Sequence, residues 1–458
     1  MNKTCFLLSL LVMAALQATA GNLSEADARL AANRFIHRQA VATAMFKTAP
    51  AASLTLAHAE PSQSVAGACD YYAYNVAGGG WVIISGEDRA VRVLGYSDSG
   101  CFDYGHLPCN LKALAEGYKR EMDYLRSQVC EWAPAAEVES EPAIVVEPLI
   151  ATTWGQSVPY NLQCPVYRDE YCVVGCVATA MAQVMKYWQY PQSCDTVASY
   201  YCSKILTRLA ALPPTTFDYS LMLDSYCHWD WDNGELVQDP YTDEQAQEVA
   251  KLSRYCGQAA RMSYNPQGSS TPVSSQLRAM KEFGYRPTAK AVRFDIFGVN
   301  AYNTQKWDSL MRQELDAGRP ILYSALDLGK GAHAFICDGY DSEGRFHFNM
   351  GWYGNCNGWY VVSALQMYHH DGFQLDFDMN HEMLVGIEPP EGWEPSGPVL
   401  AGDLDGNGSV DVDDLNVLVN LILELDTRPA PGSKPDLNGD NSVDIVDVSL
   451  LVNLILSN

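Results

Sequence analysis

The stretch Gly175-Cys-Val-Ala-Thr-Ala-Met-Ala-Gln-Val-Met-Lys-Tyr-Trp188 predicts a buried helix that begins at a cysteine. Its apolar side chains recur at helical spacing along one face, and Pro191 ends the pattern. Unpaired amide groups and the helix dipole favour an anion at a helix start, so a thiol at Cys176 is placed to ionise and act as a nucleophile. A buried or disulfide-bonded cysteine would fit the same pattern, so a catalytic role also requires a base.

The order of elements around this helix predicts an α+β fold for residues 149–390. Helical patterns come first, and strand patterns follow Pro320. This order argues against a parallel sheet built from alternating strands and helices. The predicted helices cover Thr242–Ala260, Val273–Phe283 and Lys306–Ala317, and the predicted strands cover Ile321–Leu326, Ala334–Cys337, Arg345–Met350 and Tyr360–Val362.

Among the histidines of this block, His333 is the best candidate base. It opens an apolar strand, and a turn at Asp341–Gly344 then predicts a hairpin that returns Asn349 and Trp352 towards it. An amide beside an imidazole can fix its tautomer, and an indole can shield that bond from water. Gln156, twenty residues before Cys176, can donate to an oxyanion together with the Cys176 amide. From the residues alone, His333 could equally be a strand-end histidine and Gln156 an ordinary surface residue.

The N-terminus predicts export. Met1-Asn-Lys3, an apolar run over Phe6–Leu16 and Ala18-Thr-Ala20 have the form of a signal peptide covering residues 1–20. Export permits disulfides, and the chain has 14 cysteines, whose pairing the spacing leaves open. Residues 21–148 show helix and strand patterns and end in an acidic, Ala- and Pro-rich segment over 132–147 that resembles an exposed linker.

The size and charge of the chain limit the classes of function that it can have. The chain has 458 residues, and 48% of them are hydrophobic, which indicates globular material of about three domains. The formal net charge is −25, which disfavours nucleic acid and anionic membranes as partners. We expect no membrane insertion, because no later stretch is long and apolar enough to span a bilayer.

A linker over 391–399 leads to an acidic repeat over 400–458. The loop that starts at Asp403 recurs 33 residues later at Asp436, and each loop precedes an apolar helical pattern. Oxygen ligands at loop positions 1, 3, 5, 9 and 12 are typical of a calcium loop of EF-hand type. The two loops predict two Ca²⁺ ions, with the ligands Asp403, Asp405, Asn407, Asp411 and Asp414, and Asp436, Asn438, Asp440, Asp444 and Asp447.

Four ordered segments between about Ile150 and Pro389 resemble the streptopain family of papain-like cysteine peptidases. They are Trp154-Gly-Gln-Ser-Val-Pro-Tyr-Asn-Leu162, the Gly175–Tyr187 segment, Gly331-Ala-His-Ala-Phe-Ile-Cys-Asp-Gly-Tyr340 and Phe346-His-Phe-Asn-Met-Gly-Trp352. The resemblance implies a two-lobed papain-like domain that needs no cofactor for catalysis. It implies the following roles: Cys176 as nucleophile, His333 as general base and acid, Gln156 as oxyanion donor, and Asn349 with Trp352 as orienting and shielding groups.

The resemblance extends to substrate binding and to latency. A loop ending at Ser270 matches a substrate-binding loop of the family, and Ala332 falls where a residue contacts the substrate backbone. Met350 departs from the family, which usually has Trp after the Asn. Residues 21–148 resemble the family's inhibitory propeptide, above all over Trp81–Tyr96, and cleavage is expected within 132–150. The repeat over 400–458 resembles a dockerin, a small all-α module that binds a cohesin on a scaffold or surface.

The sequence therefore predicts a secreted bacterial cysteine endopeptidase, made as a zymogen, that cleaves protein or peptide substrates through an acyl-thioester. The family implies broad specificity, with an apolar residue preferred just upstream of the scissile residue. Two alternatives stay open: a Cys/His amidase or transpeptidase acting on cell-wall peptides, and a non-catalytic adhesin with a vestigial cysteine site. Digestion of casein would distinguish a peptidase from the amidase or transpeptidase. Selective labelling of Cys176 by a thiol-reactive peptide inhibitor would distinguish a peptidase from the adhesin, because a vestigial site would not react selectively.

Overall fold

The structure is a computed structural model in which the chain divides into two compact units. We call Met1–Gly155, Cys227–Gln238 and Lys290–Gly386 unit 1, and Gln156–Tyr226, Asp239–Ala289 and Ile387–Asn458 unit 2. The described residues are 21–42, 46, 54–127, 143–230, 235–272, 274–286, 290–293, 304–327, 331–362, 379–393, 402, 404, 409–423, 435, 437–438 and 442–457.

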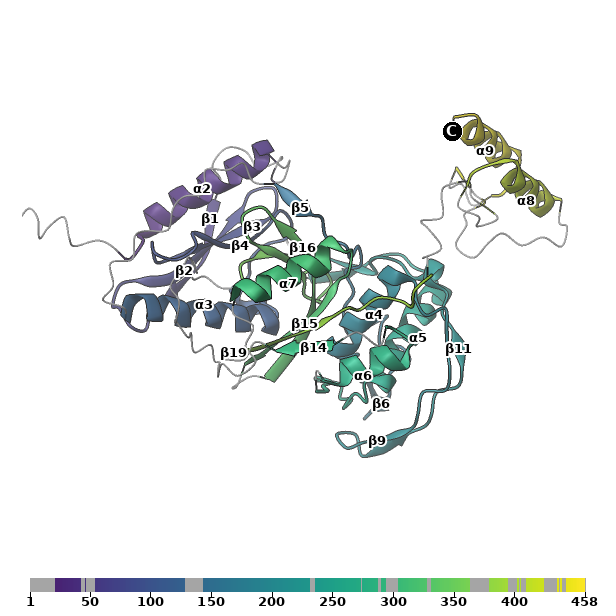
Figure 1. Ribbon diagram of the computed structural model, residues 1–458, viewed down its shortest axis with the longest axis horizontal. Helices are drawn as coiled ribbons and strands as arrows, with labels where there is room; N and C mark the ends of the chain where they lie inside the picture. Colours follow the sequence, from purple (N-terminus) through teal and green to yellow (C-terminus); the bar gives the residue numbers. More distant parts are fainter. Residues whose placement is uncertain are drawn as a thin grey trace, which may run out of the picture. The chain divides into compact units, whose positions relative to one another are not determined.

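Unit 1 is built on an eleven-stranded antiparallel sheet in the order β1-β2-β3-β4-β18-β17-β16-β15-β19-β14, with β5 paired to β16 (Figure 1). The strands are β1 Leu54–Pro61, β2 Cys69–Val76, β3 Trp81–Ser85, β4 Val93–Ser97, β5 Ile144–Val146, β14 Lys290–Arg293, β15 Ile321–Asp327, β16 Gly331–Asp341, β17 Phe346–Asn349, β18 Gly358–Tyr360 and β19 Met379–Val385. A smaller hairpin pairs β12 Cys227–Asp230 with β13 Glu235–Gln238. The main sheet therefore runs from the N-terminal segment, residues 21–127, directly into the strands that carry His333 and Asn349.

Alternating side chains decide which helix covers which face of strands β1–β4. Tyr72, Tyr74 and Val82 pack against helix α2, Glu25–Ala42. Their neighbours Tyr71 and Ala73 belong to the core that includes helix α3, Cys109–Ser127. Because successive strand residues point to opposite faces, α2 and α3 cover opposite faces of the sheet, as Figure 1 also shows.

The core beneath α3 continues into the C-terminal half of unit 1. It includes Trp307 and Met311 of helix α7, Thr304–Asp316, together with Tyr323 of β15 and Phe348 of β17. Tyr118 of α3 ties the two halves together, because its hydroxyl donates to the carbonyls of Leu94, 3.1 Å away, and Val361, 2.7 Å away. The N-terminal segment thus shares one sheet and one core with the strands of residues 321–361.

Unit 2 contains the predicted nucleophile helix. Helix α4 spans Cys176–Trp188 and packs against helix α5, Asp243–Ala259, which begins with a capping box formed by Thr242 and Gln245. Helix α6, Ser274–Glu282, packs against both. The remaining strands form short hairpins: β6 Val166–Tyr167 with β7 Glu170–Tyr171, β8 Ser193–Cys194 with β11 Thr215–Thr216, and β9 Tyr200–Cys202 with β10 Thr207–Leu209.

The C-terminal repeat folds into helices α8, Val412–Ile422, and α9, Ile445–Ser457. They enclose a small core of Leu404, Leu418 and Leu451. The predicted linker over 391–399 begins with residues that pack on unit 2, since the Trp393 indole donates to the Trp188 carbonyl at 3.2 Å. Residues 394–400 lie outside the described ranges.

The α+β class and the predicted helices are confirmed, with ends that differ by a few residues. The predicted strands are also present. Strands β1, β5, β14 and β19 and the hairpins of residues 166–238 were missed, because short strands that pair at long range have weak local patterns. The predicted linker over 132–147 is wrong at its end, where Ile144–Val146 forms β5. Among the residues that the structure describes, no helix has the length and apolar character needed to span a membrane.

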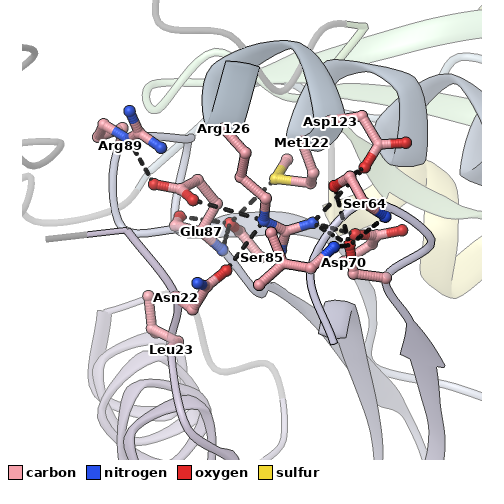
Figure 2. Close-up of polar contacts among 12 residues, drawn as sticks. Asn22, Leu23, Ser64, Asp70, Ser85, Glu87, Arg89, Met122, Asp123 and Arg126 are labelled. Carbon is pink, nitrogen blue, oxygen red and sulfur yellow. Dashed lines mark hydrogen bonds and ion pairs between the residues drawn. The ribbon is translucent and has the colours of Figure 1, made fainter. Parts of the chain in front are cut away.

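A buried ion-pair cluster holds the N-terminal segment together (Figure 2). The Arg126 side chain is 5% exposed and pairs with Asp70 and Glu87, whose side chains are 1% and 0% exposed. Arg126 also donates to Asn22 Oδ1 at 2.9 Å and to the Cys69 carbonyl at 2.7 Å. One guanidinium thereby links the C-terminal turn of α3 to β2, the β3–β4 turn and the start of the chain.

Replacing Arg126 with Met is expected to lower the free energy of unfolding of residues 54–127 by about 3–5 kcal/mol, because it leaves the buried Asp70 carboxylate without its cation and leaves Glu87 paired with Arg89 alone. Native-state hydrogen exchange measures this loss of unfolding free energy, in a Cys176→Ala background that cannot cleave itself. Arg120→Met, an exposed position on the same helix, serves as the control and should change little. Equal protection in Arg126→Met and Arg120→Met would contradict the assigned role of the cluster.

Candidate active site

Cys176 is the first residue of α4, and the local backbone explains why Gly precedes it. Gly175 has φ of +89°, a conformation that other residues adopt only under strain. A Cβ at this position would lie 2.8 Å from the Met262 side chain and 3.2 Å from the Cβ of Ser269. Gly175 therefore allows the chain to turn into α4 tightly, with Cys176 half-buried in the first helical turn.

Gln156 lies next to this helix start, although it is twenty residues away in sequence. The main-chain amide of Val174 donates to the Gln156 carbonyl at 3.0 Å. This bond holds the Gln156 backbone beside the residues that lead into Cys176. The Gln156 side chain is half-buried, and replacing it leaves the main-chain bond in place.

The predicted substrate-binding loop is tied to the same segment. The Ser269 hydroxyl donates to the Val173 carbonyl at 2.6 Å, and the Val173 amide donates to the Asn265 carbonyl at 3.3 Å. Ser270 is exposed, and its hydroxyl accepts a hydrogen bond from Lys204 Nζ at 3.2 Å. The sequence did not predict the contact with Lys204, which comes from the turn between β9 and β10.

His333 lies in β16 and is half-buried. It stands opposite Ala325 of β15, and Ala332 stands opposite Leu326. The predicted hairpin is present, since β17 returns antiparallel to β16 after the turn at residues 342–345. Asn349, the last residue of β17, is the register partner of Ile336, three residues after His333.

The Asn349 side chain is buried, and two hydrogen bonds fix its orientation. Its amide donates to the Thr152 carbonyl at 2.7 Å, and its carbonyl oxygen accepts from the Gly351 amide at 3.1 Å. Trp352 follows on the same loop and is half-buried, and its carbonyl accepts from the Trp229 indole at 3.4 Å. No motif in the sequence indicated that the hairpin of residues 227–238 contacts this loop.

Met350, the position that departs from the family, is a core residue in this structure. It is 2% exposed and packs in the main core of unit 1. Its main-chain amide donates to Asn357 Oδ1 at 2.8 Å, which fixes the loop that follows Asn349. The Trp229 indole lies at this loop, where its nitrogen donates to the Trp352 carbonyl.

Other histidines have different roles or positions. His347 Nδ1 lies 2.6 Å from Asp338 Oδ1, and Asp338 also accepts from the Ile150 amide at 3.0 Å. This buried pair secures the chain where it enters the peptidase half. His369 and His370 lie outside the described ranges, as does the side chain of His381.

Three other cysteines of unit 2 have thiols that burial makes less acidic: Cys164 and Cys172 are buried, and Cys194 is half-buried, as Cys176 is. Burial raises the pKa of Cys164 to about 12, and it raises the pKa values of Cys172 and Cys194 to about 11. Such thiols are poor nucleophiles at neutral pH. Cys176 is half-buried, and only it occupies a helix start within unit 2 among these four.

The predicted site residues divide between the units. Cys176, Gln156 and Ser270 belong to unit 2, whereas His333, Ala332, Asn349 and Trp352 belong to unit 1. Within unit 2, the structure brings Gln156 and the loop of Ser270 to the residues that precede Cys176. Within unit 1, strand pairing brings the Asn349 loop to the strand of His333.

The two acidic loops repeat the same contacts. Asp414 accepts from the Leu404 amide at 2.6 Å and the Asp411 amide at 2.8 Å. Asp447, one repeat later, accepts from the equivalent amides of Leu437 at 2.8 Å and Asp444 at 2.9 Å. Main-chain amide donors lower the pKa of Asp447, so this carboxylate is ionised at neutral pH. Both carboxylates are fully buried.

These buried carboxylates fit the last ligand position of a calcium loop, which must be anionic and held in place. Asp411, Asn438 and Asp444 also lie in the described part, whereas the other predicted ligands, Asp403, Asp405, Asn407, Asp436 and Asp440, lie outside it. Within the described part, no three His, Cys, Asp or Glu side chains gather as a metal site.

Comparison with known proteins matches each part of the chain to a family. Residues 154–360 match the Peptidase C10 family, residues 20–122 match the Spi protease inhibitor family, and residues 401–456 match the dockerin type I domain. Dockerin type I domains are calcium-binding modules, which agrees with the predicted loops.

Two curated relatives and one solved structure illustrate the similarity. The thiol protease/hemagglutinin PrtT of Porphyromonas gingivalis is 27% identical over 74% of this chain, and the match covers 40% of that protein's length. Streptopain of Streptococcus pyogenes is 29% identical over 69% of this chain and 80% of its own length. A prointerpain A fragment from Prevotella intermedia has the same fold over 74% of this chain and 100% of its own, with a TM-score of 0.57 and 24% identity.

Residues 154–360 are therefore a domain of the Peptidase C10 (streptopain-like cysteine peptidase) type, preceded by a region of the Spi protease inhibitor type and followed by a dockerin type I module.

Proposed function

We propose that this chain is a secreted zymogen that hydrolyses peptide bonds through Cys176 and His333, and that its dockerin anchors it to a cohesin-bearing scaffold or surface. The start of α4 carries the proposal. There, Gly175 turns the chain so that Cys176 opens the helix, while Gln156 and the Ser269–Ser270 loop are bonded to the two residues before Gly175.

The chemistry follows from these residues. The Cys176 sulfur attacks the carbonyl carbon of the scissile peptide bond, and the Cys176 amide with the Gln156 side chain stabilises the oxyanion. His333 takes the thiol proton and delivers it to the departing amine, which leaves an acyl-thioester on Cys176. Water, deprotonated by His333, then attacks the thioester and releases the carboxylic acid and the thiol. Asn349 orients the imidazole, and Trp352 limits water access.

Cys176→Ala and His333→Ala are each expected to abolish casein hydrolysis, because they remove the nucleophile and the base. Gln156→Ala should lower kcat by roughly 10²–10³-fold, since it removes one oxyanion donor and keeps the main-chain bond to Val174. Rates are measured under reducing conditions after an added protease has clipped the linker. Cys194→Ala is the matched control and should keep its activity.

Activity that survives Cys176→Ala would refute the proposed nucleophile. If the wild type stays inert after clipping and a thiol-reactive peptide inhibitor does not label Cys176 selectively, the non-catalytic alternative is favoured. Cleavage of cell-wall peptides without cleavage of casein would favour the amidase alternative.

The N-terminal segment has the contacts expected of a tightly bound inhibitory propeptide. Besides the β4–β18 pair, Arg345, which follows the β16–β17 turn, lies over the rings of Phe35 at 5.0 Å and Tyr96 at 5.2 Å. Arg38 of α2 pairs with Glu343 at 2.5 Å. Release of the segment must expose these buried groups, so linker cleavage and strand separation are distinct steps.

The contacts of residues 143–150 indicate where the linker is cut. Strand β5 pairs with β16, the Ser342 amide donates to the Ala143 carbonyl at 2.8 Å, and the Leu149 amide donates to the Asp338 carbonyl at 2.9 Å. A protease needs extended, accessible backbone, and this backbone is already paired in the peptidase sheet. The cut therefore lies before Ala143, and β5 stays with the mature enzyme.

N-terminal sequencing and intact mass of the matured protein should thus place its first residue between 128 and 143. A Cys176→Ala substrate protein processed in trans by the active enzyme provides the control for later trimming. A first residue at 144 or beyond would contradict the assignment of the intact β5 segment to the mature sheet.

The dockerin is proposed to bind two calcium ions, one in each acidic loop, independently of catalysis. Chelation with EGTA is expected to unfold residues 401–457, because the buried Asp414 and Asp447 would lose their counter-ions. Casein hydrolysis should persist, since no predicted catalytic residue lies in this region. Calorimetry with and without Ca²⁺ follows the unfolding, and Asp414→Asn should halve the calcium stoichiometry. Loss of casein activity in EGTA would contradict this separation.

A further inference from the structure

Two cysteines lie beyond the same end of the β4–β18 pair, on opposite sides of the junction between the propeptide and the peptidase. Tyr96 stands opposite Trp359, so the antiparallel strands place the residues after Ser97 beside those before Gly358. A Cβ at Gly358 would lie 3.2 Å from the Cβ of Ser97, which shows how closely the chains approach there. Cys101 follows β4, and Cys356 precedes β18.

The segments that carry both thiols are held in place around Trp81. On the propeptide side, Asn75 Oδ1 accepts from the Phe102 amide at 2.6 Å, and the Phe102 ring lies 6.0 Å from Trp81. On the peptidase side, the Tyr360 hydroxyl donates to the Cys356 carbonyl at 2.7 Å, and the Tyr360 ring lies 5.5 Å from Trp81. The Trp81 indole therefore packs against Phe102, which follows Cys101, and against Tyr360, which is bonded to Cys356.

The electrostatic surroundings agree with this placement. Burial raises the pKa of the Cys356 thiol, and the charges that raise it further are those of Cys101 and Asp103. Burial also raises the pKa of Cys101, with Asp103 as the second cause. The two thiols thus share an environment, and Cys101 is the more exposed of the pair.

We propose that Cys101 and Cys356 are a cross-linking site, at which a disulfide joins the propeptide covalently to the peptidase. The inference rests on the proposed role of residues 21–127 as a propeptide. The oxidant is a small-molecule disulfide such as oxidised glutathione, and exported proteins fold in compartments where disulfides form and persist. Cys101 attacks it and releases one small thiol, and Cys356 then displaces the second small thiol from the mixed disulfide. Two protein S–H bonds are lost, one protein S–S bond forms, and two small thiols carry away the protons.

The cross-link separates linker cleavage from activation. A cut in residues 128–142 would leave the propeptide attached through Cys101 and Cys356, still paired along β4 and β18. Release would then require reduction, the same condition that keeps the Cys176 thiol competent. The enzyme would stay latent in oxidising surroundings even after its linker is cut.

The test uses residues 21–458 with Cys176→Ala, so that the protein cannot cleave itself and the linker is cut only by the added protease. The protein is folded with oxidised glutathione, nicked at the linker glutamates with a glutamyl endopeptidase, alkylated and analysed by mass in strong denaturant. The two fragments should run as one species without reductant and separate with it. Cys101→Ser should separate without reductant, and Cys69→Ser, the matched control, should stay joined.

The proposal would be overturned if the two fragments of the nicked Cys176→Ala protein separate without reductant. It would also be overturned if the fragments stay linked in Cys101→Ser. Cys356→Ser should behave as Cys101→Ser does, and circular dichroism of both variants checks that they fold. Because the readout is a covalent mass in an inert protein, a failed cross-link leaves the proposed peptidase activity untouched, and a failed activity leaves the cross-link testable.

Discussion

The antiparallel pairing of β4 with β18 is the contact on which the zymogen architecture depends. It makes one sheet out of β1–β4, which the chain forms before residue 100, and strands that the chain forms after residue 140. Around it, Tyr118 bonds carbonyls on both sides, and Trp81 packs against Tyr360. An edge strand offers a row of unpaired amides and carbonyls, so covering β18 with β4 satisfies backbone groups that would otherwise need water. A propeptide bound in this way is part of the folded core.

The proposed nucleophile, Cys176, depends on a more local constraint. Gly175 must adopt positive φ in a space that admits no Cβ, and only then can Cys176 open α4. The two residues before it are bonded to Gln156 and to the Ser269 loop. Three segments separated by up to a hundred residues therefore meet at one short stretch. A substitution at Gly175 would therefore disturb all of them together.

Buried polar groups hold the remaining pieces in position. His347 with Asp338 secures the entry of the chain into the peptidase half, and Arg126 closes the propeptide around Asp70 and Glu87. Met350 shows the opposite case, in which a position expected to form an aromatic wall has become part of the apolar core. The neighbouring Trp229, from a hairpin that the sequence did not predict, places an indole at the Trp352 loop instead.

The sequence by itself determined the strongly periodic parts: α4 with its leading Gly-Cys pair, the hairpin that follows His333, the helices of the propeptide, and the repeated acidic loops. These are local patterns, in which helical spacing, turn residues and ligand positions lie within a dozen residues of one another. Cys176, His333, Gln156 and Asn349 could be named because their motifs are local too. Only the tertiary structure decided that β4 pairs with β18, that β5 belongs to the peptidase sheet, that Trp229 meets Trp352 and that Cys101 lies near Cys356. Strand pairing and side-chain contacts between distant segments depend on how the whole core packs, and no short stretch of sequence carries that information.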